Sequence, residues 1–429
     1  MNRSTSNSAG GHQITLEGKH LQEGWDFAKA DTSYLTHGLH DYPARMVPQI
    51  AHRLIETYTR EGDKILDPFC GSGTTLVEAA LLNRKAIGTD INPFAILLAK
   101  VKTTPIDFEA ANFSIYDYLS GLQKEYRELR EKRLLPNPPV DVYANLLHWF
   151  KEDVAKDLEI LYKKISAVEN PDIRDLLKIV FSATIFKCSN IDLRSSRFIR
   201  ILPEDKLKKF KPDVISYFQK RAIDSFGRVA SFSNEVKRPE IKVLNGDARK
   251  LEFANNTFDA IISSPPYGEE KNTVSYARWS KLSIAWLRLN HGQVKDAERL
   301  SLGFVVTKEA SAKLEEFPSP TVKALLAPLL ISDPNRVKDS LPFFEEYLVT
   351  LREMYRVLKP GAHCCLVIGD RSIRRKPLDM EKVTVELGEE AGFQHQASYF
   401  RKIPMKLIPW TTPTGQTISR ESIVILRKL

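Results

Sequence analysis

The sequence has no stretch that approaches the roughly 18 consecutive apolar residues of a membrane span, so we do not expect a membrane protein. Its first residues, Met1 to Gly11, are polar and lack the apolar centre of a signal peptide. Both absences favour a cytoplasmic protein in which residues 1–30 form a disordered or extended tail. No internal repeat is present, which excludes a repeat architecture.

Cysteine is scarce as well. The four cysteines show no CxxC or Cys/His spacing of a zinc site, so we expect no metal and a reduced protein.

Acidic residues are fewer than basic ones, with 54 Asp+Glu against 63 Lys+Arg, a net charge of +9 and a pI near 9.1. This balance favours polyanionic partners without establishing them.

The remaining composition, 42% hydrophobic over 429 residues, suffices for one large core plus an insertion. Residues 64–90 show a strand, a glycine turn, a helix and a second strand, which is a βαβ unit of a parallel sheet. Further strands are expected at 241–247, 258–263, 363–369, 396–400 and 422–426, with helices at 343–358 and 381–391. The pattern predicts an α/β fold with a sheet of about seven strands.

Helical periodicity dominates residues 107–239, between the second and third strands. We therefore expect a core in two parts, 31–106 and 240–429, separated by a helical insertion at 107–239. Within the second part, residues 268–340 are punctuated by proline and predict loops and short helices.

The first chemically informative segment is Leu66-Asp-Pro-Phe-Cys-Gly-Ser-Gly-Thr-Thr75, where a strand ends in a glycine turn. Gly71 and Gly73 lack a Cβ, so a small cofactor could lie against the main chain. The turn lacks the Lys-Ser/Thr ending of a phosphate-binding loop, and a tight connection alone would explain it equally well.

Asp90 ends the second strand, 19 residues after Gly71. An acidic residue at about this spacing accepts hydrogen bonds from ribose hydroxyls in dinucleotide-binding folds. Capping of the following helix is the alternative role. Asp247, in Asn-Gly-Asp at the end of the third strand, has the same two interpretations.

The second segment is Phe258-Asp-Ala-Ile-Ile-Ser-Ser-Pro-Pro-Tyr267. Its two prolines fix the backbone and remove two N–H donors, so hydroxyl and carbonyl acceptors face whatever lies at the strand end. Ser264 and the Pro265 carbonyl could accept the hydrogens of an exocyclic amine, and Tyr267 could stack on its ring. The structural alternative is a strand stopped by Pro-Pro with an exposed tyrosine.

In their order along the chain, these segments, with Gly88-Thr-Asp-Ile-Asn-Pro93, resemble the motifs of S-adenosylmethionine-dependent amino-methyltransferases acting on DNA. The segment His37-Gly-Leu-His-Asp-Tyr-Pro-Ala-Arg-Met46 is similar to the one that precedes the first strand in that family. The resemblance covers about residues 36–101 and 240–429 and leaves the helical insertion outside. It implies a Rossmann-like methyltransferase with a mixed, mostly parallel seven-stranded sheet.

The resemblance also implies roles for individual residues. S-adenosylmethionine would be the cofactor, with Asp90 at the ribose and Asp247 at the adenine edge. Its remaining contacts would come from two groups, which are the turn residues Asp67, Phe69, Gly71, Gly73 and Thr74, and Tyr42, Pro43 and Ala44 at the methionine end. The target base would be received by Ser264, Pro265, Pro266 and Tyr267.

A serine before Pro-Pro-Tyr resembles the cytosine-N4 enzymes, whereas adenine-N6 enzymes more often carry Asp or Asn. The expected substrate is therefore cytosine in double-stranded DNA, flipped out of the helix at a cost of a few kcal/mol. Adenine N6, an RNA or protein amide, and an inactive nucleic-acid-binding module with the same fold remain alternatives. A companion restriction endonuclease is a further expected partner.

Carbon methylation is disfavoured, because it needs a cysteine nucleophile and the chain has no Pro-Cys pair. Cys70, in the glycine turn, is better explained as a small packing residue.

One departure from the family concerns target recognition. The family's recognition region tends to fall between the third-strand motif and the catalytic corner, but only 16 residues lie between Asp247 and Ser264. The candidates are therefore the insertion and residues 268–340. In the insertion, a basic cluster of Lys187, Arg194, Arg197 and Arg200 is suited to phosphate contacts or to a solvated face. In residues 268–340, Trp279 could fill the space of a flipped base or lie in the core.

Overall fold

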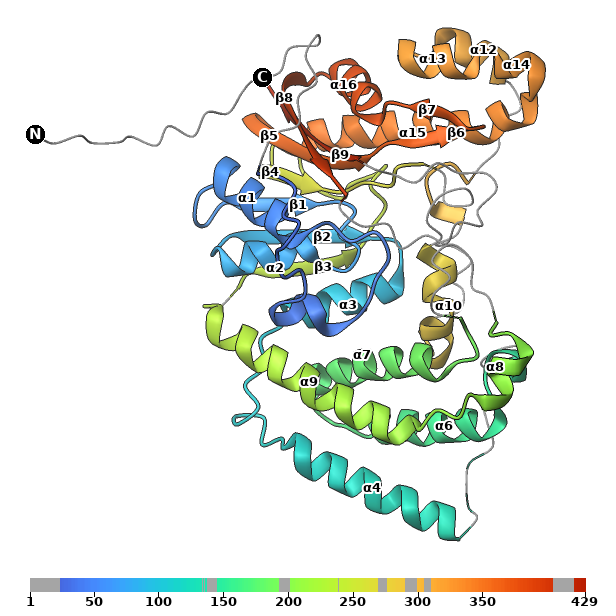
Figure 1. The fold of residues 1–429 in the computed structure, drawn as a ribbon. Coiled ribbons are helices and arrows are strands. Elements are labelled where there is room, and N and C mark those ends of the chain that lie inside the picture. Colours follow the sequence, from blue (N-terminus) through green and yellow to red (C-terminus); the bar gives the residue numbers. More distant parts are fainter. Residues whose placement is uncertain are drawn as a thin grey trace, which may run out of the picture.

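A seven-stranded sheet forms the centre of the computed structural model, which describes residues 24–132, 134, 136, 145–192, 201–237, 239–268, 276–289, 299–304, 310–403 and 420–429 (Figure 1). Its order is β3-β2-β1-β4-β5-β9-β8. The bounds are β1 Lys64–Asp67, β2 Lys85–Asp90, β3 Ile241–Asn245, β4 Phe258–Ser263, β5 Leu358–Gly369, β8 Gln394–Lys402 and β9 Arg420–Arg427. The first five strands pair in parallel, and β9 pairs antiparallel with β5 and β8. The predicted mixed, mostly parallel sheet is confirmed.

Helices cover both faces of this sheet, which explains why its central strands are nearly continuous apolar runs. Neighbouring residues of one strand enter different cores, as Ile261 and Ile262 of β4 do. One face packs against α1 (Pro48–Tyr58) and α2 (Thr74–Leu81). The other packs against α15 (Pro334–Val357) and α16 (Met380–Glu390).

A separate helical layer follows β2 and α3 (Pro93–Thr103), and the chain returns from it to β3. It comprises α4 Ile115–Glu131, α5 Leu146–Trp149, α6 Glu152–Ser166, α7 Pro171–Cys188, α8 Glu204–Lys209 and α9 Val214–Glu235. Its apolar core also includes α3 and the loop residues Leu39 and Tyr42. In Figure 1 this layer lies below α3, with α4 farthest from the sheet.

The segment expected as loops and short helices divides between two cores. Its first helix, α10 (Tyr276–Trp286), joins the helical layer, where Trp286 packs edge-on against Phe150 and Phe181. Its later helices, α12 (Ala310–Glu316), α13 (Pro320–Leu326) and α14 (Leu329–Ser332), pack beside α15.

Three local features differ from the expectation. Helix α15 begins at Pro334 rather than Phe343, because Asp333 caps it and Pro334 suits a first helical position, and it continues through Pro342. Strand β5 begins five residues earlier than predicted, at Leu358. A short hairpin of β6 (Arg371–Ile373) and β7 (Lys376–Leu378) follows β5 and was not predicted.

The tail predicted over residues 1–30 is too long at its inner end. Trp25 is buried and stacks on Tyr399 of β8 at 5.3 Å. The Lys402 amide donates to Asp26 at 2.7 Å. Residues 24–30 therefore belong to the folded molecule, and residues 1–23 lie outside those the structure describes. In the described ranges, no helix is both long and apolar enough to cross a bilayer.

Candidate active site

A cavity lies at the carboxyl edge of the sheet, where β1, β2 and β4 end. Both informative segments reach it, since Gly71 and Ser264 line the same space. The predicted site residues in its lining are Tyr42, Pro43, Ala44, Asp67, Phe69, Gly71, Thr74, Asp90, Asp247, Ser264 and Pro266. Parallel strands explain this meeting, because their carboxyl ends share one edge, where ligands bind in open α/β sheets.

The glycine turn joins β1 to α2. Both Gly71 and Gly73 have positive φ angles, of 47° and 82°, which favour glycine. Gly73 does not line the cavity. Instead, a Cβ on Gly73 would lie 2.9 Å from the Cβ of Ala99 in α3, so this glycine allows two helices to approach. Cys70, directly before Gly71, is buried, and burial raises the pKa of its thiol, as expected for a packing residue.

Asp90 supports this turn from the neighbouring strand. Its carboxylate accepts from the Gly71 amide at 2.9 Å and from the Asn92 amide at 2.8 Å. The cap of α3 is Asn92 itself, whose side chain accepts from the Phe94 amide at 3.0 Å. The capping alternative for Asp90 is therefore wrong, and its carboxylate borders the cavity instead.

Asp67 links the two strands on which the informative segments lie. Its Oδ1 accepts from the Ser263 hydroxyl at 2.6 Å and from the Phe69 amide at 3.2 Å. Burial raises the pKa of Asp67 to about 6, although the hydrogen bond from Ser263 opposes this rise. The structure thus holds a buried carboxyl group between β1 and β4.

Asp247 lies on the far side of the cavity from this pair of strands. Arg249 binds its carboxylate with Nε at 3.0 Å and Nη2 at 2.7 Å, and reaches Glu346 of α15 with Nη1 at 2.6 Å. This bidentate contact fixes the carboxylate orientation.

The Ser-Pro-Pro-Tyr corner follows β4. The Ser264 hydroxyl donates to the carbonyl of Val367 in β5 at 2.9 Å and lies 3.3 Å from the Tyr267 hydroxyl. Pro265 and Tyr267 do not line the cavity. Tyr267 packs toward the core that contains α15, and its hydroxyl lies 3.5 Å from Glu421 of β9. The interpretation of an exposed tyrosine is wrong, since this side chain is largely covered.

Two aromatic side chains, Tyr42 and Tyr276, also line the cavity. Tyr42 stacks on Tyr276 at 6.0 Å and meets Trp279 edge-on at 6.1 Å. Trp279 in turn stacks on Phe186 at 4.4 Å, so it belongs to the helical core. Sequence reasoning missed Tyr276 as a cavity residue, although an aromatic shortly after the corner is a usable signal.

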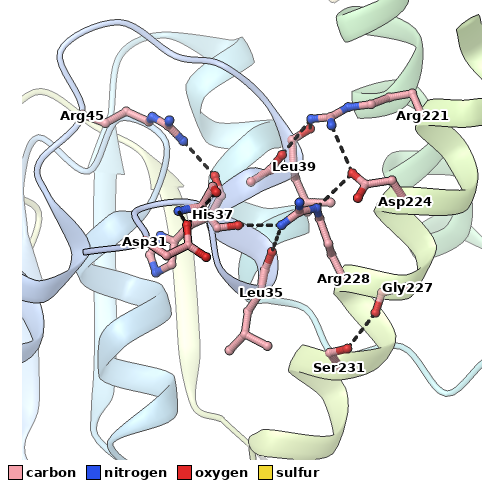
Figure 2. A network of polar contacts seen from close by, with 12 residues as sticks. Asp31, Leu35, His37, Leu39, Arg45, Arg221, Asp224, Gly227, Arg228 and Ser231 are labelled. Atoms are coloured by element: carbon pink, nitrogen blue, oxygen red, sulfur yellow. Dashed lines mark hydrogen bonds and ion pairs between the residues drawn. The ribbon is translucent and has the colours of Figure 1, made fainter. Parts of the chain in front are cut away.

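The loop that supplies Tyr42, Pro43 and Ala44 contains the 3₁₀ helix η1 (Leu35–Leu39), which α9 holds in place (Figure 2). Arg221 donates to the carbonyls of Gly38 and Leu39 at 2.7 and 2.8 Å. Arg228 donates to the Ser33 carbonyl at 2.5 Å. Asp224 lies between the two arginines and pairs with both. The helical insertion therefore supports the loop that brings Tyr42, Pro43 and Ala44 to the cavity.

A second anchor for the same loop is Glu78 of α2, which is fully buried. It accepts from Tyr34 at 2.5 Å, His37 at 2.6 Å and His52 at 2.8 Å. Burial acts to raise the pKa of Glu78, but these hydrogen bonds outweigh it and lower the pKa below its ordinary value. The sequence contained no signal for this cluster.

Other predicted groups lie apart from the cavity or outside the described residues. Arg194, Arg197 and Arg200 belong to the latter, so their phosphate contacts stay a prediction. All four cysteines are buried and free, as expected for a reduced protein.

Comparison with known proteins identifies relatives. A family model described as DNA methylase matches residues 4–101. The Type II methyltransferase M.MvaI of Kocuria varians is 30% identical over 424 residues, covering 94% of this chain and 92% of that protein. The Type II methyltransferase M.BsoBI of Geobacillus stearothermophilus is 22% identical over 426 residues, and the match covers 85% of this chain and 80% of that protein.

Among solved structures, the rRNA methyltransferase AviRa of Streptomyces viridochromogenes matches with a TM-score of 0.35 and 11% identity, covering 93% of each chain. The likeness to M.MvaI extends along nearly the whole of both chains, and the motifs meet in one cavity. This chain therefore belongs to the S-adenosylmethionine-dependent DNA amino-methyltransferases of the restriction–modification type.

Proposed function

We propose that this DNA methyltransferase modifies the exocyclic N4 amine of cytosine. The observation that carries the proposal is Ser264 at the cavity, with its hydroxyl hydrogen directed to the Val367 carbonyl at 2.9 Å. With its hydrogen on Val367, the Ser264 oxygen can accept from the Tyr267 hydroxyl at 3.3 Å with one lone pair and from an incoming donor with the other. An exocyclic amine is such a donor.

The methyl acceptor is a nitrogen, so no covalent enzyme intermediate is needed. S-adenosylmethionine supplies the electrophilic methyl group when it is bound. Ser264 and the Pro265 carbonyl would accept the amine hydrogens, which leaves the nitrogen lone pair directed at the methyl group. The Glu421 carboxylate near Tyr267 favours a protonated tyrosine, because burial and this neighbour both raise the pKa of Tyr267. Tyr267 would therefore stay a neutral ring that supports the corner, and because it does not line the cavity, stacking on the flipped base is not assigned to it.

The residues around the cavity fit the cofactor chemically. S-adenosylmethionine carries a sulfonium, an ammonium, ribose hydroxyls and an adenine amine, which are cations and hydrogen-bond donors. Asp67, Asp90 and Asp247 border the cavity and offer carboxylate acceptors to these groups. We assign Asp90 to the ribose, Asp247 to the adenine edge, and the loop of Tyr42, Pro43 and Ala44 to the methionine end.

Cytosine is preferred to adenine because of the residue before Pro-Pro-Tyr. A neutral serine is shorter than Asp or Asn, and its hydroxyl here is already oriented by Val367. Adenine N6 is also an amine donor that the same acceptors could hold, so N6-methyladenine is the alternative product.

The test is transfer of labelled methyl groups from S-adenosylmethionine to duplex DNA, followed by nucleoside analysis. We expect label in N4-methylcytosine. Label in N6-methyladenine would contradict the base assignment, and label in RNA or protein but not in DNA would contradict the substrate. A second test separates an active enzyme from an inactive nucleic-acid-binding module. The heat of S-adenosylmethionine binding is measured by calorimetric titration of wild type and of Asp90→Ala. Equal, negligible heats in both would favour the inactive module.

A companion restriction endonuclease is also proposed, since both relatives described above are named Type II methyltransferases. Protection of methylated DNA from cleavage by a nuclease of matching specificity would support this pairing.

A further inference from the structure

The hairpin β6–β7 has an unusual turn. Ile373 pairs with Lys376, so Arg374 and Arg375 are its two turn residues. Their φ angles are +50° and +64°. Positive φ at both central positions is the requirement of a type I′ turn, for which Asn-Gly is strongly preferred. Two arginines there are strained, and strained residues kept in place point to a function for their side chains.

The turn is exposed and positively charged. Arg374, Arg375 and Lys376 are consecutive and all lie at the surface. Arg374 pairs with Asp333, the cap of α15, which fixes one side of the turn to the fold. The tip thus presents cations from a rigid support.

The hairpin is also tied to the catalytic corner. Its first residue, Arg371, is buried against Gly268, which directly follows Tyr267. A Cβ on Gly268 would lie 2.1 Å from Nη1 of Arg371, so a larger residue there would displace the guanidinium group. The hairpin follows β5, whose Val367 carbonyl accepts from Ser264. In Figure 1, β6 and β7 lie on the same side of the sheet as α10.

We propose that the Arg374–Arg375 turn binds the phosphate backbone of the DNA beside the target base. Guanidinium groups match phosphate oxygens in charge and in bidentate geometry. Contacts of this kind set the register and orientation of the duplex without reading its sequence. Because Arg371 connects the hairpin to the corner, a phosphate bound at the tip would place the duplex at a set distance from Ser264. The inference rests on the proposed function in taking DNA as the bound substrate.

The test is the double variant Arg374→Asn/Arg375→Gly. Asn-Gly suits a type I′ turn better than Arg-Arg, so the hairpin should keep its fold while both charges are lost. Binding to a fluorescein-labelled 30-base-pair duplex of arbitrary sequence is followed by anisotropy from 50 to 300 mM salt. We expect affinity to fall on the order of tenfold near 0.1 M salt and the salt slope to fall by about 1, because Arg374 already pairs with Asp333. Cofactor affinity by calorimetry should be unchanged.

Two controls accompany this variant. Arg374→Lys/Arg375→Lys keeps the charge and should retain most of the binding. Lys85→Ala/Arg427→Ala removes two cations from the opposite edge of the sheet, where β2 begins and β9 ends, and should change the slope little. If the Asn-Gly variant binds with wild-type affinity and slope, the inference is wrong, even if wild type methylates DNA. If wild type methylates no DNA and shows no salt-dependent binding, both proposals fail.

Discussion

At the scale of single residues, Asp67 shows how one buried carboxyl group can make stability depend on pH. Its pKa rises from an ordinary 3.8 to about 6 because it is buried. The folded state therefore binds more protons than the unfolded state between these values, so stability falls as pH rises from about 4 to 6. Above pH 6 the buried charge costs at most about 3 kcal/mol.

Asp67→Asn should remove this cost. The hydrogen bonds from Ser263 and Phe69 reach the same oxygen, Oδ1, which an asparagine can reproduce, while the contact with the Thr75 hydroxyl persists only if the asparagine side chain offers it an acceptor. We expect a higher melting temperature than wild type at pH 8, no difference near pH 4, and weaker S-adenosylmethionine binding at pH 8. Calorimetric melting across this pH range and cofactor titration measure these effects. A variant less stable than wild type at pH 8 would contradict the argument.

The two turn glycines should respond differently to alanine. At Gly73 the new Cβ would lie 2.9 Å from Ala99, whereas at Gly71 the nearest atom, Cε1 of Tyr42, lies at 3.6 Å. Gly73→Ala should cost about 1–3 kcal/mol in free energy of unfolding. Gly71→Ala should cost less stability and chiefly weaken cofactor binding, because it borders the cavity. Urea unfolding and cofactor titration of both variants test this, and a reversed order would contradict it.

At the scale of elements, the cavity depends on how η1 is held between α2 and α9. Glu78 accepts hydrogen bonds from two residues of the loop and from His52 of α1. Arg221 and Arg228 donate to backbone carbonyls of the same loop. None of these anchors lines the cavity. Residues 42–44, which follow shortly after η1, do line it. They are positioning residues.

Glu78→Gln should therefore shift cofactor binding more than chemistry. The amide can accept fewer hydrogen bonds, and a buried donor left unpaired costs about 1–3 kcal/mol. We expect the KM for S-adenosylmethionine to rise about tenfold while kcat changes less than twofold, measured by methyl transfer to DNA at saturating DNA. Glu128→Gln, on the surface of α4, is the matched control. A fall in kcat with unchanged KM would contradict the assignment.

At the scale of the whole molecule, the sheet and the helical layer share α3. Its residues Phe94, Leu97 and Leu98 enter the helical core, while Ala99 packs under the sheet. A helical insertion of this kind cannot lose its structure without exposing α3 and Tyr42. We therefore expect the two parts to unfold together.

Urea unfolding can test this coupling with two probes. Trp149, Trp279 and Trp286 belong to the helical layer, so tryptophan fluorescence mostly reports that layer, whereas far-UV circular dichroism reports both parts. Coincident midpoints are expected for one cooperative transition. A fluorescence transition at clearly lower urea would show that the layer melts alone.

The sequence by itself determined the sheet, the order of its motifs and the residues at its carboxyl edge. Strand periodicity, glycine turns and the Pro-Pro corner act over a few neighbouring residues, so their consequences can be derived locally. The meeting of Gly71 and Ser264 followed from parallel strands ending at one edge.

Only the tertiary structure decided what supports that edge. Glu78 lies 41 residues from His37, and Arg221 lies 183 residues from Gly38. The acceptors of Arg221 and Arg228 are backbone carbonyls, which every residue possesses and no residue type reveals. Likewise, Arg371 meets Gly268 through the packing of β5 beside β4. A polar group needs a hydrogen-bond partner once it is buried. Which distant groups become partners is therefore decided only when the fold packs.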